Sequence, residues 1–220
     1  AKQIIAPLEA GIVLGFDFGL TPACVVCQVT ASRRLIQLRE FVTWDGRKEF
    51  KQQGIEKLAS GVHMACNRLY PGLPIEIYAD PAGWAKVQTD EKTCMHVLAE
   101  IFGDEVPVMQ GAISFQARRE ATSNLLCGMV IGQPQYLVSP SCSMTIEGLA
   151  GAYMYKQTGE GTSAVVHDIP DKGAHSHVVE ALQYIVTGVY GTAGQRRSDY
   201  GEWAEAEDEE VPATRASLFY

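Results

Sequence analysis

Short apolar stretches separated by turn residues fill the first 44 positions of the chain. Apolar residues dominate 10–19 and 22–30, and apolar and polar residues alternate over 34–44. Runs and period-two alternation of this length are typical of β-strands. The first two stretches are joined only by a short turn that contains Pro22, which is too short for a parallel crossover. We therefore predict three strands in an antiparallel meander.

The pattern changes after the third predicted strand, where helical spacing and compact apolar runs alternate. Helices are expected over 48–69, 91–102, 114–128 and 141–150, and strands over 75–79, 106–110 and 135–139. Two β-like segments around a Gly-rich turn predict a hairpin over 151–171, and a last helix is expected over 176–189. A meander followed by β-α units predicts an α/β protein with a mixed sheet flanked by helices, which is the layout of the ribonuclease H-like fold.

Charge divides the chain into a nearly neutral body and an acidic end. The net charge is −8, and seven of the 26 acidic residues lie between Asp199 and Tyr220. Apolar periodicity is lost there, which predicts one domain over 1–195 and a partly disordered acidic tail over 196–220. No run of 18 apolar residues is present, so we expect no membrane-spanning helix. The six cysteines show no second C-x-x-C pair at zinc-site spacing and are expected to be reduced thiols.

Three carboxylates come from separate predicted elements. Asp17 lies in the middle of an apolar strand, Asp80 follows the strand over 75–79, and Glu180 lies early in the last helix. Each alone has an ordinary explanation, as a strand-edge residue, a loop start before proline or a solvated helix residue. An unpaired charge in an apolar setting is costly, however, so Asp17 needs a partner. Convergence of the three acids would suit hard divalent cations, and two such ions can stabilise the oxygens of a phosphoryl displacement. We therefore predict a metal ion, or a pair of ions, beside Asp17.

Five segments also carry motifs in a fixed order. They are GFDFGLTPA (15–23), IYADPAGWAK (77–86), FQARREATSNLL (115–126), LVSPSCSMTIEGLAGAYMYK (137–156) and HSHVVEALQYI (175–185). Together they resemble the C-terminal nuclease domain of the large terminase subunit of tailed bacteriophages. In that family they correspond to the first-strand motif, the second-acid motif, an Arg-x-x-Ala helix, a Ser-Pro-x-Cys segment followed by Gly-x-Tyr, and a closing His-x-x-Asp-Ala-Leu-x-Tyr motif. The resemblance covers most of residues 10–190.

The resemblance implies an endonuclease that cuts concatemeric, double-stranded viral DNA during genome packaging, in the cytoplasm of the host cell. The family uses two Mg²⁺ or Mn²⁺ ions. Its large subunit also has an N-terminal packaging ATPase and acts with a small terminase subunit and a portal protein. This sequence has no G-x-x-x-x-G-K-[ST] phosphate loop, so the resemblance concerns the nuclease half alone. The ATPase domain of the full-length chain, the small subunit and the portal are thus the expected partners, with no membrane involved.

The resemblance also assigns site residues. By position, Asp17 and Asp80 match the first two family acids, and His177 matches a histidine that some members have three residues before the third acid. Glu180 stands where the family usually has Asp, which lengthens the side chain by one methylene. Two nearby carboxylates are alternatives for the third metal ligand: Asp171 and Asp168.

In the mechanism that we expect, Asp17 bridges two ions. One ion, shared with Glu180, would activate a water, and the other, shared with Asp80, would neutralise the leaving 3′ oxygen. His177 would position groups or transfer a proton within this site. Cleavage would tolerate many sequences, because the ions contact the phosphate and not the base. Four cations are candidates for contacts to the DNA backbone, although each is also typical of a solvated surface: Arg118, Arg119, Lys156 and Lys172.

Two other classes of function remain open. Asp17-Phe18-Gly19 after a strand also occurs in ATP-binding proteins of the actin and sugar-kinase group. That group needs a second glycine-rich phosphate loop, which residues 77–190 do not offer. The other class is a non-catalytic module that docks to DNA or to the portal and whose acids are structural. The near-neutral body and the glutamate at position 180 favour this second class.

Overall fold

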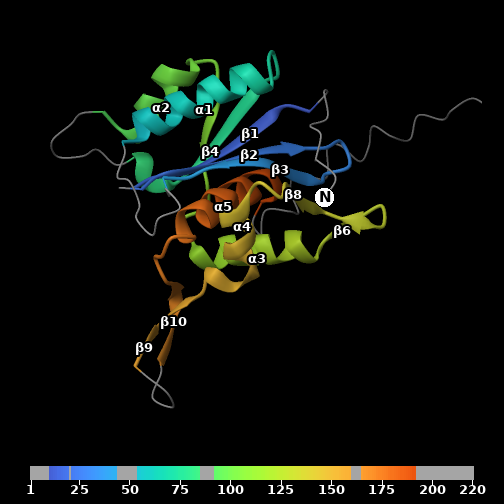
Figure 1. Cartoon of the computed structure of the whole chain (residues 1–220), viewed down its shortest axis with the longest axis vertical. Helices are drawn as coiled ribbons and strands as arrows, with labels where there is room; N and C mark the ends of the chain where they lie inside the picture. Colours follow the sequence, from blue (N-terminus) through green and yellow to red (C-terminus); the bar gives the residue numbers. More distant parts are fainter. Residues whose placement is uncertain (1–9, 20, 44–53, 85–91, 160–164, 192–220) are drawn as a thin grey trace, which may run out of the picture.

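A mixed six-stranded sheet lies between two layers of helices in the computed structural model (Figure 1). The structure describes residues 10–19, 21–43, 54–84, 92–159 and 165–191. The strands of the sheet are β1 (Ile12–Asp17), β2 (Ala23–Val29), β3 (Leu35–Phe41), β4 (Ile75–Ala79), β5 (Val108–Gln110) and β8 (Tyr136–Val138). The helices are α1 (Ile55–Leu69), α2 (Cys94–Phe102), α3 (Phe115–Cys127), α4 (Ser143–Glu147) and α5 (Ser176–Tyr190). Helices α1 and α2 cover one face, and α3, α4 and α5 cover the other.

The order of strands in the sheet is β5-β4-β1-β2-β3-β8. Strands β1, β2 and β3 are antiparallel neighbours, as expected of strands joined by short turns. Strand β4 is parallel to β1, β5 is parallel to β4, and β8 is parallel to β3. The parallel strands β4 and β5 are connected through α2, which is the kind of crossover that parallel pairs require. The predicted α/β arrangement, an antiparallel meander followed by β-α units, is therefore confirmed.

The described elements agree with the predicted ones except at a few places. The predicted helix over 48–69 is observed from Ile55, and its expected first residues lie outside the described part. The predicted helix over 141–150 is shorter, because α4 ends at Glu147 and a π-helical turn, η2 (Gly148–Ala152), follows. A 3-10 turn, η1 (Pro81–Trp84), stands where we expected a loop.

A small hairpin of β6 (Met129–Val130) and β7 (Gln133–Pro134) was not predicted. Its two turn residues, Ile131 and Gly132, both have positive φ, as a type I′ hairpin turn requires. Isoleucine rarely adopts this conformation. The sequence has Ile-Gly here instead of the Asn-Gly pair that usually marks such a turn, which is why the hairpin was not predicted.

The predicted hairpin over 151–171 is formed by β9 (Tyr155–Thr158) and β10 (Val165–Pro170) and extends away from the helices (Figure 1). Its tip and the predicted tail over 196–220 lie outside the described residues. All six cysteines are free thiols, and four of them are buried. Among the helices of the described segments, none has both the length and the apolar character needed to span a bilayer.

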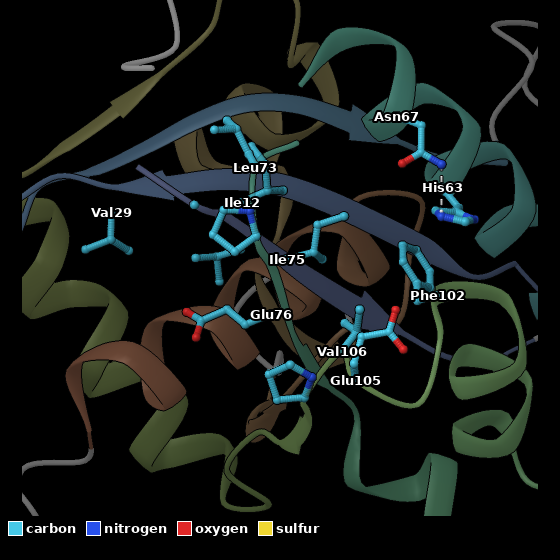
Figure 2. A pocket seen from close by; sticks show the side chains of 14 residues that line it. Ile12, Val29, His63, Asn67, Leu73, Ile75, Glu76, Phe102, Glu105 and Val106 are labelled. Carbon is cyan, nitrogen blue, oxygen red and sulfur yellow. Dashed lines mark hydrogen bonds between the residues drawn. The ribbon is translucent and has the colours of Figure 1, made fainter. Parts of the chain in front are cut away.

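On the face covered by α1 and α2, the side chains of Ile12, Leu14 and Phe16 are almost fully buried. A cavity of about 700 Å³ lies at the end of the sheet where β1 and β4 begin (Figure 2). His63 Nε2 and Asn67 Nδ2 form a hydrogen bond of 3.0 Å in its wall. None of the predicted site residues lines this cavity, because the predicted acids lie at the opposite ends of the same strands.

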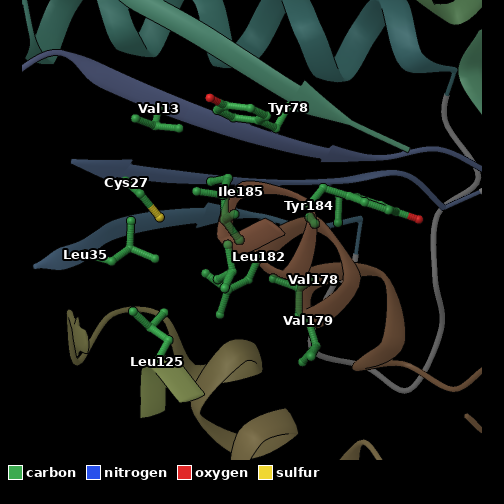
Figure 3. Close-up of a cluster of buried hydrophobic side chains, with 14 of the residues drawn as sticks. Val13, Cys27, Leu35, Tyr78, Leu125, Val178, Val179, Leu182, Tyr184 and Ile185 are labelled. Carbon is green, nitrogen blue, oxygen red and sulfur yellow. The ribbon is translucent and has the colours of Figure 1, made fainter. Parts of the chain in front are cut away.

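On the opposite face, α5 packs directly on β1, and its buried side chains include Leu182 and Ile185 (Figure 3). A Cβ atom at Gly15 would lie 2.2 Å from the carbonyl oxygen of Ala181. No residue other than glycine allows so close an approach of helix and strand backbones. The contact fixes the N-terminal half of α5 beside the end of β1.

Candidate active site

Asp17 and Asp80 lie side by side where two parallel strands end. Asp17 is the last residue of β1 and is 2% exposed. Phe16 is opposite Ala79 in the β1–β4 register, and the N–H of Asp80 donates to the carbonyl oxygen of Phe16 at 2.9 Å. Side chains alternate along a strand, so Asp80 is directed to the same face as Tyr78, which packs against α5. The Asp80 carboxylate accepts a hydrogen bond of 3.0 Å from the N–H of Ala82, which holds it at the start of η1.

Helix α5 brings two more predicted residues to this position. His177 Nδ1 lies 2.6 Å from Asp17 Oδ2 and forms a hydrogen bond with it. Glu180 lies one turn later, is 2% exposed, and its charge acts on Asp17. The close contact of α5 with Gly15 explains why a helix far along the chain can place both side chains here. Four predicted residues therefore come together from three elements.

The surroundings of Asp17 disfavour the ionised form of its carboxylate. Burial raises the pKa of Asp17 from 3.8 to about 6, and the negative charges of Glu180 and Asp80 also act to raise it. The hydrogen bond and the charge of His177 act in the opposite direction and do not cancel the effect. A cation placed between these acids would remove the repulsion and favour the ionised form of Asp17. Strong perturbation of this kind is typical of functional sites, and also of structural ion-pair networks.

Glu180 already has a cation. Lys172 Nζ contacts both of its carboxylate oxygens, and the hydroxyl of Tyr153 donates to Glu180 Oε1 at 3.0 Å. Burial and the negative charge of Glu180 raise the pKa of Tyr153, so this hydroxyl stays protonated and keeps donating. Lys172, which we expected to contact DNA, neutralises one of the predicted metal ligands in this structure.

Two tyrosines near the acids are absent from the predicted site. One is Tyr153. The other is Tyr184, whose pKa is raised by burial and by the charges of Asp17, Asp80 and Glu180. Its hydroxyl is therefore within the electric field of all three carboxylates. Both tyrosines belong to the segments that carry the family resemblance, GAYMYK and HSHVVEALQYI, and that was the signal available in the sequence.

Arg118 is not available to a DNA phosphate in this structure, contrary to our expectation. It is 7% exposed, and its guanidinium lies over the ring of Tyr184, 5.1 Å from the centroid. It donates to the carbonyl oxygens of Ala112 at 3.1 Å and Ile113 at 2.9 Å, and to Gln183 Oε1 at 3.3 Å. Arg118 therefore fastens the segment before α3 to helix α5.

The remaining predicted residues lie around the acids without joining them. Arg119 is exposed and bonds to the hydroxyl of Tyr155, and Lys156 is exposed on β9. The alternative third acids are exposed on β10 and just after it: Asp168 and Asp171. Of the three candidates for the third acid, Glu180 is the one whose charge acts on Asp17.

The donor set suits a hard divalent ion, because carboxylate oxygens are the ligands that Mg²⁺ and Mn²⁺ prefer. In this structure, however, these side chains are not arranged closely enough to enclose such an ion. In the described residues, no three His, Cys, Asp or Glu side chains are close enough together to hold a metal ion. Asp17 and Asp80 are adjacent, and His177 is the basic side chain that bonds Asp17. Glu180 is paired with Lys172, which a metal ion bound to Glu180 would have to displace. An ion at Asp17 and Asp80 would therefore suit the chemistry of these residues, and Glu180 could join it only if Lys172 left its carboxylate.

Comparison with known proteins bears on this fold. No family model and no curated protein matches the sequence. Among solved structures, the large terminase from a thermophilic bacteriophage matches with a TM-score of 0.60 and 15% identity, over 86% of this chain and 42% of that one. This chain is similar in fold to a large terminase. The predicted ribonuclease H-like fold is thereby confirmed, and the chain spans less than half the length of that terminase.

Two further structures match less closely. The large terminase nuclease from the thermophilic phage G20c gives a TM-score of 0.49 at 14% identity, over 81% of this chain and 82% of that one. The yeast mitochondrial Holliday junction resolvase Ydc2 gives a TM-score of 0.44 at 9% identity, over 84% of this chain and 82% of that one.

Proposed function

We propose that this chain is a divalent-metal-dependent nuclease that hydrolyses phosphodiester bonds of double-stranded DNA. The observation that carries the proposal is the buried Asp17 carboxylate, which ends a central strand between two other acids and has a raised pKa. Burying such a charge among like charges is costly, and bound cations would offset this cost. The similarity in fold to a large terminase supports the same function.

The proposed roles follow from the contacts. Asp17 would share one ion with Asp80 and a second with Glu180, and bound ions of this kind lower the pKa of water and neutralise a leaving oxygen. His177 holds the Asp17 carboxylate through its 2.6 Å hydrogen bond and is placed to accept or deliver a proton beside it. Tyr153 holds Glu180 through the hydrogen bond from its hydroxyl to Oε1. Arg119 and Lys156, both exposed, would contact the DNA backbone.

The biological task that we propose is cutting of concatemeric viral DNA during genome packaging. The support is the similarity in fold to a phage large terminase and the order of the sequence motifs. In that case the chain would act as part of a longer protein that also carries an ATPase, together with a small subunit and a portal, in the host cell cytoplasm.

The experiment is cleavage of supercoiled plasmid in Mn²⁺ or Mg²⁺ by the purified chain. We expect Asp17→Asn to lower the rate at least about 100-fold, because it removes the charge proposed to bridge the ions. Asp104→Asn is the matched control, since it makes the same substitution at an exposed position away from the acids. Equal nicking by wild type and Asp17→Asn, with both proteins folded, would refute the proposal.

One observation favours a second candidate, a DNA- or portal-docking module without catalysis. Lys172 neutralises Glu180, and such a pair is also what a structural acid would show. The same plasmid assay decides between the two. DNA binding without cleavage in any divalent metal would favour the docking function over the nuclease function.

A further inference from the structure

A pocket of about 170 Å³ lies beside the acids, between α3, α5 and the root of the β9–β10 hairpin. Three aromatic side chains line it: Phe115, Tyr153 and Tyr155. The rings of Phe115 and Tyr155 meet edge to face, with centroids 6.1 Å apart. Tyr153 is shared with the acid site, because its hydroxyl donates to Glu180. The pocket and the candidate active site are therefore neighbours separated by one side chain.

The pocket also offers an unpaired polar group. Gln183 is 3% exposed and lines it. Its Oε1 accepts from Arg118, but within the described residues its Nε2 has no hydrogen-bond partner. Because Gln183 lines the pocket, a molecule bound there could pair with this nitrogen. A nearly buried amide donor without a partner costs free energy, and a ligand with an acceptor atom would recover it.

A third feature is the cation in the pocket wall. Arg119 is exposed, lines the pocket, and contacts the hydroxyl of Tyr155. A ligand that combines a planar ring, an acceptor atom and a neighbouring negative charge would satisfy the aromatic rings, Gln183 and Arg119 together. An aliphatic side chain of another protein would leave Gln183 unpaired. The volume is well below that of pockets for drug-sized ligands, which suits a single ring system.

We propose that this pocket binds one unpaired nucleobase of the strand that passes the acid site. The proposal rests on the proposed nuclease function and specifies its substrate: DNA with an unwound or single-stranded nucleotide next to the cut. Stacking on aromatic side chains tolerates every base, so the pocket recognises a lack of pairing and not a sequence. Taking a base out of a duplex costs free energy of unstacking and unpairing, and this cost is absent where the strand is already single.

The test is to block the pocket by placing a large side chain at an exposed position that lines it. Ser123 is exposed on α3 and lines the pocket, whereas its neighbour Asn124 is exposed and does not. We expect Ser123→Trp to weaken binding of a labelled single-stranded oligonucleotide about tenfold, the size expected for loss of one base–aromatic stack, and to leave binding of the matching duplex unchanged. Asn124→Trp should change neither. Fluorescence anisotropy in Ca²⁺ or EDTA measures binding without cleavage, and circular dichroism melting checks that each variant is folded.

A second variant, Phe115→Leu, removes an aromatic wall without filling the space and should also weaken single-strand binding. Wild-type binding of the single strand by both variants would overturn the proposal, and that is the result expected if a protein side chain is the true occupant. An equal loss for single strand and duplex would overturn it too. The proposed nuclease function fails on a different readout: if plasmid is not cut but Ser123→Trp still selectively weakens single-strand binding, only the catalytic proposal is lost.

Discussion

Glu180 and Lys172 form an ion pair whose two members differ greatly in exposure. The side chain of Glu180 is 2% exposed, and that of Lys172 is 59% exposed. Lys172 can therefore move into water with little rearrangement, whereas Glu180 cannot leave the site. A divalent ion that takes Glu180 as a ligand has to displace this ammonium. In this structure the lysine neutralises the buried Glu180, and it would compete with a metal ion for this carboxylate.

We expect Lys172→Ala to raise the affinity of the chain for Mn²⁺ about tenfold, because a competing positive charge at contact distance is removed. Isothermal titration calorimetry without DNA measures this affinity directly. Lys57→Ala is the matched control, since Lys57 is exposed on α1 away from the acids. Unchanged Mn²⁺ binding by Lys172→Ala would mean that Glu180 is not a metal ligand.

Asp17 should make stability depend on pH in a characteristic direction. Its pKa of about 6 lies above the ordinary value of 3.8, so between these two values the folded state binds more protons than the unfolded one. In EDTA, the Asp17 contribution to the free energy of unfolding should therefore rise as pH falls from about 7 to about 4, by up to about 3 kcal/mol. Urea denaturation of wild type and Asp17→Asn checks this.

The variant Asp17→Asn should be more stable than wild type at pH 7 in EDTA, and the difference should vanish near pH 4. The comparison between the two proteins isolates the effect of Asp17, because Glu180, Asp80 and His177, which face it, are present in both. The exposed Asp104→Asn should show no such difference. A wild type that is the more stable of the two at pH 7 would contradict the raised pKa.

At the scale of elements, the site depends on how α5 is seated on the sheet. Gly15 lets the backbone of α5 lie against β1, and a Cβ atom at Gly188 would lie 2.0 Å from the ring of Tyr78 on β4. Two glycines thus define the distance of the helix from β1 and β4. Because His177 and Glu180 lie on this helix, its seating also sets their position against Asp17.

We expect Gly15→Ala to destabilise the protein by about 3 kcal/mol, because the new methyl group would clash with a backbone carbonyl that cannot turn away. Gly61→Ala is the matched control. Gly61 lies inside α1 with no atom within 4 Å of the added Cβ, so this change should stabilise by about 0.5–1 kcal/mol. Urea unfolding of both variants is the measurement, and a neutral Gly15→Ala would show that the helix is not held as described.

At the scale of the whole molecule, the sheet carries one apolar cluster on each face. Among the described residues, the buried members of both clusters lie between Ile12 and Val186. The acids lie at the edge between the two layers, at the ends of β1 and β4, so both layers have to be in place for the site to form. The described part of the chain therefore holds two apolar clusters whose burial stabilises the fold.

The loss of apolar periodicity after residue 195 predicts that removing residues 196–220 leaves the melting temperature within about 2 °C of wild type, since a change of 1 kcal/mol shifts it by a few degrees. Plasmid cleavage should also be unchanged. Differential scanning calorimetry and the plasmid assay on the shortened chain check the predicted domain over 1–195. A fall of about 10 °C or more would show that the acidic end is part of the folded unit.

The sequence predicted the elements well where apolar periodicity was strong. Strand β4 and helix α5 agree closely with the predicted ranges, because a compact apolar run and a long helical repeat each have one good solution. It failed at the β6–β7 hairpin, whose turn places an isoleucine at positive φ. The sequence also suggested that Arg118 is on the surface. An arginine pair on a weakly amphipathic helix gives no sign that one of the two is buried against the ring of Tyr184.

The sequence by itself determined which acids could act, because a carboxylate inside an apolar strand needs a partner whatever the tertiary arrangement. The tertiary structure alone decided which of them meet. Glycine at position 15 brings α5 close enough for His177 to bond Asp17, and the loop after β10 brings Lys172 to Glu180. Such contacts join residues up to 160 positions apart. They depend on packing distances and side-chain directions that periodicity along the chain does not record.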